Sequence, residues 1–517
     1  MLSRVCLIRY LCNVLCVASL SVCGASFGES DVTSQSVAVS AEFDVAQSLN
    51  EQIDKRVGSA DLESKALCAV YIFDGATGKV LVNKHGEEAF APASCNKLLT
   101  TAASLSLFGP DKRIETDIYR TGVIDANGTL KGNLIVVGGG DPSICGRYET
   151  DKKDVTAELR RWVDAMTSAG IKKVHGDLVA DIRVFDQEYF HKNWYLNERG
   201  EYYEAEIWGL QFNEGCVDME FSSKDLLPGD TAKMTLIPPT TYATVSNNIK
   251  VLARGRAGST EFRREDLSND IVATGTLAFD STKIESATIC NGPLWALHTL
   301  RDVMTSAGIT VSGKLRIADS LEDAPAVAGG ILVHRRLSPP MSELINTVNR
   351  VSQNFYADSL CKLLGNRFRG SGSWAAGCAV IREWLRNQPV WSEGHMMDDG
   401  SGLSDENRVA PRTLAELQRF MNEGPYSSQW RDSLPQGGVR GSLKARFAET
   451  DATAEQKARI FGKTGYIDGV RSLCGYILRK DGTPVYYMIN VVNSYRSAKQ
   501  QLDLIDDIVV MTLKAYE

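Results

Sequence analysis

Short apolar segments separated by turn residues lie near both ends of the chain and predict two β-hairpins. Asp74-Gly75-Ala76-Thr77-Gly78 joins the first pair of segments, and Asp481-Gly482 lies between the second pair. Glycine beside aspartate is typical of tight hairpin turns. The four segments are residues 66–73, 79–82, 472–478 and 484–492.

The spacing of apolar positions predicts helices between and after these hairpins. A run of small and apolar residues starts at residue 93 and continues to Phe108, where Gly109-Pro110 ends it. Strands at both ends with helices between them predict one mixed α/β domain in which strands distant in sequence pair. The later helical segments are 341–351, 354–364, 374–387, 411–422 and 501–515.

The middle of the chain contains an internal repeat. Met-Thr-Ser-Ala-Gly-Ile at 166–171 recurs at 304–309. Each copy ends a helical pattern and is followed by a β-like segment with an early glycine, Gly176 or Gly313. The repeat predicts two similar helix–strand units within one inserted domain. From about 183 to 269 the chain is rich in Tyr, Thr and Pro with short alternating runs, which predicts a further β-rich insertion.

The N-terminal residues predict export. Arg4 and Arg9 precede a mostly apolar stretch over 11–22, and small residues follow, which is the order of a secretory signal. An uncleaved anchor and lipoprotein attachment at Cys23 are the alternatives. Residues 26–45 are interpreted as a linker. Because no later stretch resembles a membrane helix, we expect a mature protein without a membrane span, secreted to the periplasm.

Composition excludes several function classes. The net charge of −7 is spread along the chain, so nothing favours a nucleic-acid partner. Of 12 cysteines, eight follow the signal segment, and none forms a C-x-x-C pair that would predict a zinc or redox site. The six histidines are scattered, and the chain has no H-E-x-x-H, G-x-S-x-G or Walker motif. We therefore expect no metal or cofactor.

Ser94 and Lys97 are the first candidate catalytic residues. Three residues on a helix is nearly one turn, so the two side chains share a face. A partly desolvated lysine can lose its proton near neutral pH and then deprotonate a serine hydroxyl. A helix start also directs backbone N–H groups at an incoming oxygen. The spacing alone is weak, because Ser359 and Lys362 repeat it on an ordinary helical segment.

Two further motifs change this interpretation. Ser352-Gln353-Asn354 alone is explained as well by helix capping, and Lys463-Thr464-Gly465 alone by a surface turn. In the order Ser-x-x-Lys, Ser-x-Asn and Lys-Thr-Gly, however, the three motifs are the signature of penicillin-recognising serine enzymes.

On these motifs the sequence resembles the class C low-molecular-mass penicillin-binding proteins, the DacB-like D-alanyl-D-alanine carboxypeptidase/endopeptidase family. The resemblance runs from about residue 45 to the end. More than two hundred residues separate Ser94 from Ser352, whereas class A β-lactamases bring these motifs closer together. Further segments that carry the resemblance are 136–142, 176–181 with Phe185, 399–404, 434–435 and 441–443.

The resemblance implies a penicillin-binding, β-lactamase-like α/β (α+β) fold with an antiparallel sheet and a helical subdomain. A long insertion would interrupt it and form a second domain with a nested β-rich third domain. The expected boundaries are a signal peptide at 1–25, a linker at 26–45, a catalytic domain at 46–111 plus 330–517, an inserted domain at 112–182 plus 270–329, and a nested domain at 183–269.

The resemblance also implies an acyl-enzyme mechanism without a cofactor. Ser94 would attack the peptide carbonyl between two D-alanines, with Lys97 as general base. Ser352 would relay the proton to the leaving amine, Asn354 would hold the substrate amide, and Lys463 would bind the terminal carboxylate. The expected substrates are peptidoglycan stem peptides, and β-lactams would be covalent inhibitors.

The remaining expected site residues bind the substrate. Thr464 would contact the terminal carboxylate, Gly465 belongs to the same motif, and the backbone N–H groups of Ser94 and Tyr466 would form the oxyanion hole. Asp181 matches an acidic position that binds the amino group of the stem peptide in relatives. We expect Cys95, beside the nucleophile, to face the core.

Two positions depart from the family pattern. Gln353 stands where aspartate is usual, and Tyr466 stands where Ser or Thr usually follows Lys-Thr-Gly. Tyr466 could narrow the mouth of the site. The alternatives to a carboxypeptidase are a β-lactamase or esterase on the same fold and a non-catalytic wall-binding protein. The balance of carboxypeptidase and endopeptidase activity, the disulfide pairing and the oligomeric state are left open.

Overall fold

The structure is a computed structural model that describes residues 45–517, apart from 61, 63, 319–320 and 327. The predicted signal peptide and nearly all of the predicted linker lie outside the described residues. The chain divides into a short unit that ends at Ser48 and a large unit, Leu49–Glu517, which contains all the elements named below. In the part of the chain that the structure describes, every helix is too short or too polar to span a bilayer.

The first sheet unites strands from the two ends of the large unit. Its order is β18-β19-β20-β1-β2, and every neighbouring pair is antiparallel. Both predicted hairpins are confirmed, and the long-range pairing joins them: Tyr71 of β1 lies opposite Met488 of β20. The bounds are β1 Leu67–Asp74, β2 Val80–Lys84, β18 Ile460–Ile467, β19 Val470–Leu478 and β20 Pro484–Val492.

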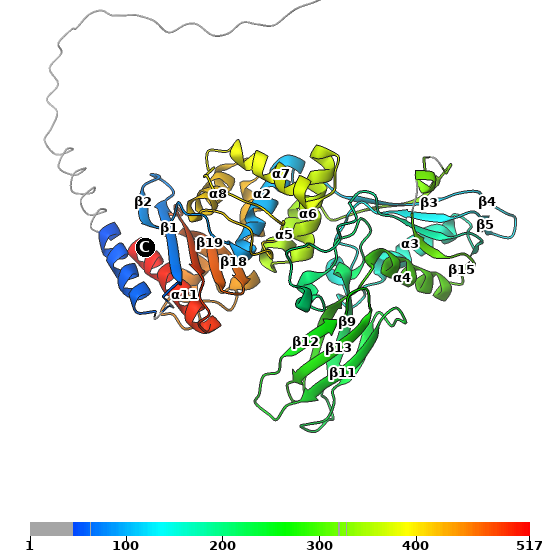
Figure 1. The fold of residues 1–517 in the computed structure, drawn as a ribbon, viewed down its shortest axis with the longest axis horizontal. Helices are drawn as coiled ribbons and strands as arrows, with labels where there is room; N and C mark the ends of the chain where they lie inside the picture. The colour runs from blue at the N-terminus through cyan, green and yellow to red at the C-terminus, as the bar shows by residue number, and fades with distance from the viewer. Residues whose placement is uncertain (1–44, 61, 63, 319–320, 327) are drawn as a thin grey trace, which may run out of the picture. The chain divides into compact units, whose positions relative to one another are not determined.

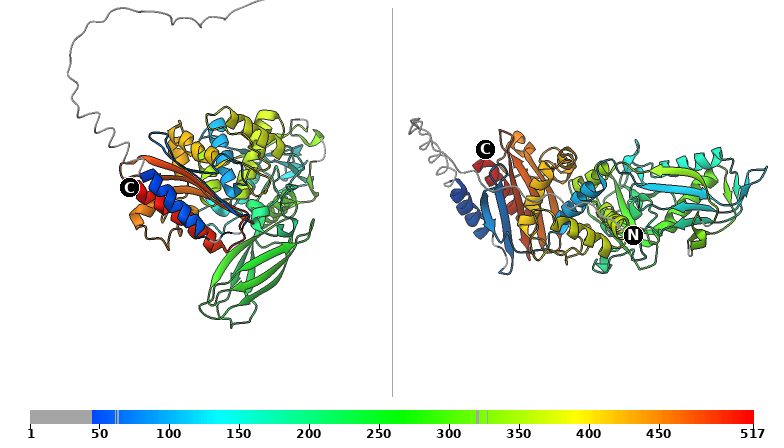
Figure 2. Two further views of the ribbon diagram at one scale, coloured as in Figure 1. Left: turned by 60° about the vertical axis from the view of Figure 1, so that its left-hand side comes forward. Right: turned by 90° about the horizontal axis from the view of Figure 1, so that it is seen from above.

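Both faces of this sheet are buried, which explains its nearly continuous apolar segments. Tyr71, Phe73, Tyr486 and Met488 belong to one core together with the helical region, and the residues between them are buried as well. Figures 1 and 2 show α11 on one face of the sheet and α2 and α8 on the other.

The predicted helices are confirmed, although α6 continues five residues beyond the predicted end at 364 and the last helix starts three residues earlier than predicted. All of them except the last form the helical region on one side of the sheet, and a 3₁₀ turn, η1 (Ala93–Asn96), leads directly into the first. The bounds are α2 Lys97–Phe108, α5 Met341–Arg350, α6 Asn354–Arg369, α7 Trp374–Arg386, α8 Pro411–Glu423, α9 Ser427–Ser433, α10 Ala454–Ala458 and α11 Ala498–Ala515.

The inserted segment contains the predicted repeat. Helices α3 and α4 end at the two copies of the hexapeptide, and each is followed by two short strands. The strands of one copy pair in parallel with those of the other, β7 with β15 and β8 with β16, so the two helix–strand units are confirmed. The bounds are α3 Ala157–Ser168, β7 Lys173–Val174, β8 Leu178–Asp181, α4 Gly292–Ser306, β15 Thr310–Val311 and β16 Leu315–Ile317.

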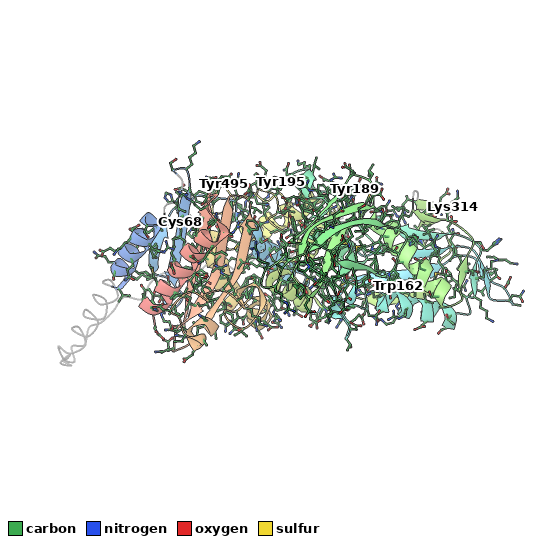
Figure 3. The ribbon with its side chains drawn as sticks, turned by 90° about the horizontal axis from the view of Figure 1, so that it is seen from below. Cys68, Trp162, Tyr189, Tyr195, Lys314 and Tyr495 are labelled. Carbon is green, nitrogen blue, oxygen red and sulfur yellow. The ribbon has the colours of Figure 1, made fainter. Side chains whose placement is uncertain are left out.

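Two sheets are built on these units. One has the order β16-β8-β6-β3-β17 and the other β15-β7-β5-β4. Their core includes Trp162 of α3, and the partly buried Tyr189 packs against this core. Figure 3 labels both side chains. The remaining bounds are β3 Glu115–Arg120, β4 Val123–Ile124, β5 Thr129–Lys131, β6 Leu134–Val137 and β17 Ile331–Leu337.

The β-rich part consists of two three-stranded sheets, β10-β9-β14 and β11-β13-β12. Strands β13 and β14 lie after residue 269, and β17 lies after residue 330 yet pairs with β3. The predicted domain boundaries stay a prediction. From this pairing we propose that the nested domain ends at about residue 290 instead of 269, and that the inserted domain ends at about residue 338 instead of 329. The bounds are β9 Cys216–Ser222, β10 Lys233–Ile237, β11 Thr244–Val251, β12 Thr260–Arg264, β13 Asp270–Leu277 and β14 Thr282–Thr288.

Candidate active site

Ser94 and Lys97 lie where the turn η1 becomes the helix α2. Ser94 is in the 3₁₀ turn, and Lys97 is the first residue of the α-helix. Residues three apart are nearly eclipsed in a 3₁₀ turn, so the two side chains lie one above the other. The Nζ atom of Lys97 lies 2.9 Å from Ser94 Oγ.

Lys97 is completely buried, and three oxygens surround its amine. Besides Ser94 Oγ, Nζ donates to Asn354 Oδ1 at 2.6 Å and to the carbonyl oxygen of Ser401 at 2.7 Å. Burial lowers the pKa of Lys97 to about 7, with a further contribution from the nearby charge of Lys463. The carboxylates of Asp358 and Asp399 oppose this lowering.

The acceptors around Lys97 define which proton is available. The carbonyl of Ser401 cannot donate a hydrogen bond, and Asn354 directs its own amide N–H elsewhere, 2.9 Å from the carbonyl oxygen of Tyr203. In the neutral amine, two N–H groups therefore satisfy Asn354 and Ser401. The lone pair is left facing Ser94 Oγ.

Ser352 and Lys463 form a second serine–lysine pair. Lys463, in the edge strand β18, donates from Nζ to Ser352 Oγ at 2.8 Å and to the carbonyl oxygen of Thr464 at 2.6 Å. Burial lowers the pKa of Lys463 to about 8. Ser352 has a φ of +61°, an uncommon conformation for a serine that places it just before helix α6.

Close packing of η1 against β18 brings these pairs together. Cys95 is completely buried and lies 3.1 Å from the carbonyl oxygen of Lys463, and Ser472 Oγ lies 2.7 Å from the carbonyl oxygen of Pro92. A Cβ atom at Gly465 would collide with Ser472 Oγ and lie 2.8 Å from the Pro92 carbonyl oxygen. Glycine is therefore required at this position, and the expectation that Cys95 faces the core is confirmed.

A cavity of about 830 Å³ opens beside these side chains. Of the predicted site residues, Ser94, Ser352, Asn354, Thr464, Gly465 and Tyr466 line this cavity. Lys97 and Lys463 lie behind it, in contact with the two serines.

Tyr466 stands at the rim of the cavity, with 61% of its surface exposed. The Arg471 guanidinium lies over its ring at 3.3 Å from the centroid. Thr464 also lines the cavity, and its hydroxyl donates to Ser442 Oγ at 2.8 Å.

Asp181 is not among the described residues that line the cavity. It ends strand β8 in the inserted segment, is buried, and accepts hydrogen bonds from Arg183 at 2.8 and 2.5 Å. Its substrate-binding role stays a prediction. The carboxylates in the cavity wall belong to Glu198 and Asp468 instead.

The second Ser-x-x-Lys motif lies inside helix α6 and has unrelated contacts. Ser359 donates to the carbonyl oxygen of Phe355, and Lys362 pairs with Asp186 at 2.8 Å and lies over the ring of Trp374. These contacts agree with the sequence interpretation of this motif as a helical coincidence.

Several groups in the site were missed by the sequence analysis. The carbonyl groups of Ser401 and Tyr203 hold Lys97 and Asn354, and a carbonyl group has no sequence signal of its own. Tyr195, labelled in Figure 3, lines the cavity from the inserted segment, as do Asn197 and Tyr202. Among the residues that the structure describes, no group of three or more His, Cys, Asp or Glu could hold a metal ion.

The chain is similar in sequence to known carboxypeptidases. The chain is 29% identical over 477 residues to a D-alanyl-D-alanine carboxypeptidase of Actinomadura sp. strain R39, an alignment that covers 89% of this chain and 84% of that protein. It is 24% identical over 423 residues to the D-alanyl-D-alanine carboxypeptidase DacB of Haemophilus influenzae, covering 81% and 83% of the two chains.

The fold is that of a solved penicillin-binding protein. The crystal structure of penicillin binding protein 4 (dacB) from Haemophilus influenzae matches with a TM-score of 0.75 at 21% identity, covering 90% of this chain and 99% of that one. A family model matches residues 49–515. The chain belongs to the D-Ala-D-Ala carboxypeptidase 3 (S13) family of serine peptidases.

Proposed function

We propose that this protein releases the terminal D-alanine from D-alanyl-D-alanine peptides through an acyl-enzyme on Ser94. The observation that carries the proposal is the contact of a buried lysine with the serine, Lys97 Nζ to Ser94 Oγ at 2.9 Å. A serine hydroxyl is a weak nucleophile until a neighbouring base takes its proton. The pKa of Lys97, lowered to about 7, suits that task at neutral pH.

In the first step, Ser94 Oγ attacks the carbonyl carbon between the two D-alanines, and Lys97 takes the hydroxyl proton. The C–N bond then breaks, and the leaving amine takes a proton from Ser352, which lies beside Lys463. Ser352 regains a proton from the Lys97 ammonium, so Lys97 is neutral again. The backbone N–H groups of Ser94 and Tyr466 stabilise the negative oxygen of the intermediate. In the second step, the neutral Lys97 takes a proton from a water molecule that attacks the ester, and it returns this proton to Ser94 Oγ as the ester C–O bond breaks and the acid product leaves.

Lys463 and Thr464 bind the carboxylate of the terminal D-alanine. The Lys463 ammonium provides a charge-assisted hydrogen bond that a neutral chain end would not form. Glu198 and Asp468 are the carboxylates available in the cavity wall to an amino group of the substrate. Peptidoglycan stem peptides combine a D-alanyl-D-alanine end with a side-chain amino group, and they are the substrates we propose.

β-Lactams would acylate the same serine. Their strained amide presents a carbonyl carbon next to a carboxylate, so Ser94 and Lys463 would receive them as they receive the peptide. A structure of the Haemophilus protein is of its complex with a β-lactam.

We also propose that the chain is exported and acts in the periplasm. The proposal rests on the arginines and apolar run at the N-terminus, which are typical of a secretory signal. Fractionation of cells, followed by N-terminal sequencing of the mature protein, tests it. Cleavage near residue 25 and recovery with the periplasmic proteins are expected, and recovery of the intact chain from the cytoplasm would contradict it.

Two measurements test the catalytic proposal. The protein should release D-alanine from an acyl-D-Ala-D-Ala peptide, and Ser94→Ala should abolish the release. After incubation with a labelled penicillin, mass spectrometry should find one covalent adduct on the peptide that contains Ser94. A cross-linked peptide dimer, assayed in parallel, measures endopeptidase activity. Rapid turnover of the β-lactam without any D-alanine release would support a β-lactamase instead.

A further inference from the structure

Gln353, the middle residue of the second motif, makes a contact that connects the inserted segment to the site. Only 6% of its surface is exposed. Its Nε2 donates to Glu214 Oε2 at 2.6 Å, and its Oε1 accepts from the backbone N–H of Phe355 at 3.4 Å. Gln353 is the N-cap of helix α6, which begins at Asn354. Its side chain therefore bridges Glu214 and the start of the helix that carries Asn354.

Glu214 is itself fixed by an arginine. Arg147 donates from Nε to Glu214 Oε1 at 2.5 Å and from its terminal nitrogen to Oε2 at 2.7 Å. Such a two-point contact between guanidinium and carboxylate fixes orientation as well as charge. Because Glu214 is an ionised acceptor, the group that faces it at position 353 must be a hydrogen-bond donor.

Both ends of the Glu214–Gln353 contact lie beside backbone in an uncommon conformation. Ser352 has a φ of +61° and Glu214 a φ of +55°, and Glu214 lies between Asn213 at +48° and Gly215 at +71°. A non-glycine residue in this region is strained and persists only where its surroundings hold it. The hydrogen bond between Glu214 and Gln353 joins the two unusual segments directly.

The same part of the insertion also contacts Asn354. A Cβ atom at Gly215 would lie 3.1 Å from the Phe355 ring, so this loop packs tightly on the first turn of α6. The carbonyl oxygen of Tyr203 accepts from Asn354 Nδ2 at 2.9 Å. The insertion thus holds both residues that follow Ser352.

We propose that Arg147, Glu214 and Gln353 are positioning residues that fix Ser352 and Asn354 for the reaction. The inference rests on the proposed function and extends it to residues outside the cavity that the substrate enters. It also explains why glutamine occupies a position where the resembled family usually has aspartate. A carboxylate at 353 would face the carboxylate of Glu214, whereas the glutamine amide donates to it.

The test is Gln353→Glu, which changes one amide to a carboxylate of nearly the same shape. We expect kcat and kcat/KM for D-alanine release to fall together by about tenfold or more, with KM little changed, because the contact aligns groups for the transition state. Acylation by labelled penicillin should slow to a similar extent. Gln187→Glu, which adds the same charge at an exposed position, is the matched control and should remain at the wild-type rate.

The double variant Glu214→Gln/Gln353→Glu reverses donor and acceptor at this contact but leaves position 214 with one oxygen for Arg147. Activity should therefore recover in part, by at least about threefold over Gln353→Glu, as coupled neighbours do. Titration with excess labelled penicillin gives the fraction of active molecules and separates slow chemistry from a loss of folded protein. Wild-type activity in Gln353→Glu, or a double variant no better than Gln353→Glu alone, would overturn the inference.

If Gln353→Glu does not fold, as judged by thermal melting, Glu214→Ala replaces it with the same expected loss. Wild-type activity in a folded Glu214→Ala variant would again overturn the inference. A wild-type protein that neither releases D-alanine nor binds penicillin covalently would overturn the proposed function itself, so the two failures are distinguishable.

Discussion

At the scale of single residues, the two buried lysines differ in what surrounds them. Lys97 contacts Ser94, the proposed nucleophile, and two fixed acceptors, and burial together with the charge of Lys463 lowers its pKa to about 7. Lys463 contacts Ser352 and one carbonyl oxygen, and its pKa is about 8. The lower pKa belongs to the lysine whose lone pair faces Ser94. The geometry and the pKa therefore both support Lys97 as the proposed base.

These values predict a bell-shaped pH dependence. Lys97 must be neutral to accept the serine proton, so kcat/KM should rise with pH through about 7. Lys463 must be protonated to bind the substrate carboxylate, so kcat/KM should fall as pH rises through about 8. The two limbs are properties of the interacting pair. Initial rates with an N-acylated D-Ala-D-Ala substrate between pH 5 and 10 measure this profile, and a flat profile across that range would contradict the assignment.

The position of Tyr466 at the rim predicts that bulky substrates and inhibitors have restricted access to the cavity. Its exposed ring, covered by the Arg471 guanidinium, projects at the rim where a smaller residue would leave room. Tyr466→Thr should keep the backbone N–H and widen the mouth, and we expect bulky penicillins to acylate about threefold to tenfold faster, a gain of about 1 kcal/mol. Stopped-flow acylation with a small and a large β-lactam measures the difference. An equal change for both compounds would argue against a role in access.

At the scale of elements, the Ser-x-x-Lys pattern occurs in two helices and has a different environment in each. Ser94 and Lys97 lie at a helix start beside a cavity, whereas Ser359 and Lys362 lie inside α6, with their polar atoms bound to other groups. Ser359→Ala should therefore release D-alanine at a rate within about twofold of the wild type and lose about 1 kcal/mol of stability with its hydrogen bonds. Comparison with Ser94→Ala checks this, because only Ser94→Ala should prevent the penicillin adduct.

The approach of η1 to β18 predicts a sharp effect at Gly465. Gly465→Ala would bring a Cβ atom against Ser472 Oγ and the Pro92 carbonyl oxygen, so β18 must shift away from Ser94. We expect penicillin acylation to slow by about tenfold to a hundredfold, as a displacement of about 1 Å in a reacting group can cause. Gly58→Ala, with open space around it, is the control and should be acylated at the wild-type rate. Unchanged acylation of Gly465→Ala would contradict the requirement for close packing.

The elements were largely predictable from sequence because burial leaves a repeating pattern. The hairpins around Asp74–Gly78 and Asp481-Gly482 and helices α5, α7 and α8 were expected close to their observed bounds, and α6 was expected from its first residue but ends five residues later than predicted. Short strands such as β7 and β15 were harder to place, because two residues are too few to show the alternation of apolar and polar positions that marks a strand. Only the repeated hexapeptides before them indicated that the two units correspond.

At the scale of the whole molecule, the site depends on segments that lie far apart in the sequence. The three motifs could be identified from the sequence, but the contacts made by the insertion could not. Examples are the hydrogen bonds from Asn354 to the Tyr203 carbonyl oxygen and from Gln353 to Glu214. Each of these contacts depends on how the backbone packs, and no residue type marks it. Asp181 shows the converse, because a residue matched by motif is bound to Arg183 and lies outside the cavity wall.

The contacts divide the insertion into a part that supports the site and a part that does not touch it. Residues 196–215 supply Glu198, Tyr203 and Glu214, whereas none of the described residues between 223 and 281 lines the cavity. Strands β9 and β14 pair with Ser222 opposite Thr282, so an Asn-Gly turn could join them there.

Replacement of residues 223–281 by Asn-Gly should therefore separate stability from catalysis. The change removes Phe262, whose ring lies 6.3 Å from that of Phe221, and Arg264, the buried ion-pair partner of Glu206. Phe221→Thr and Glu206→Gln therefore accompany it, and a lower melting temperature is expected. In the folded protein, D-alanine release from a small acyl-D-Ala-D-Ala peptide should stay within about threefold of the wild type, because Glu214 and Tyr203 keep their places. A folded variant that binds no penicillin would show that the β-rich sheets support the serine chemistry after all. Retained activity on the small peptide, with altered activity on intact peptidoglycan, would indicate that those sheets contact the peptidoglycan polymer.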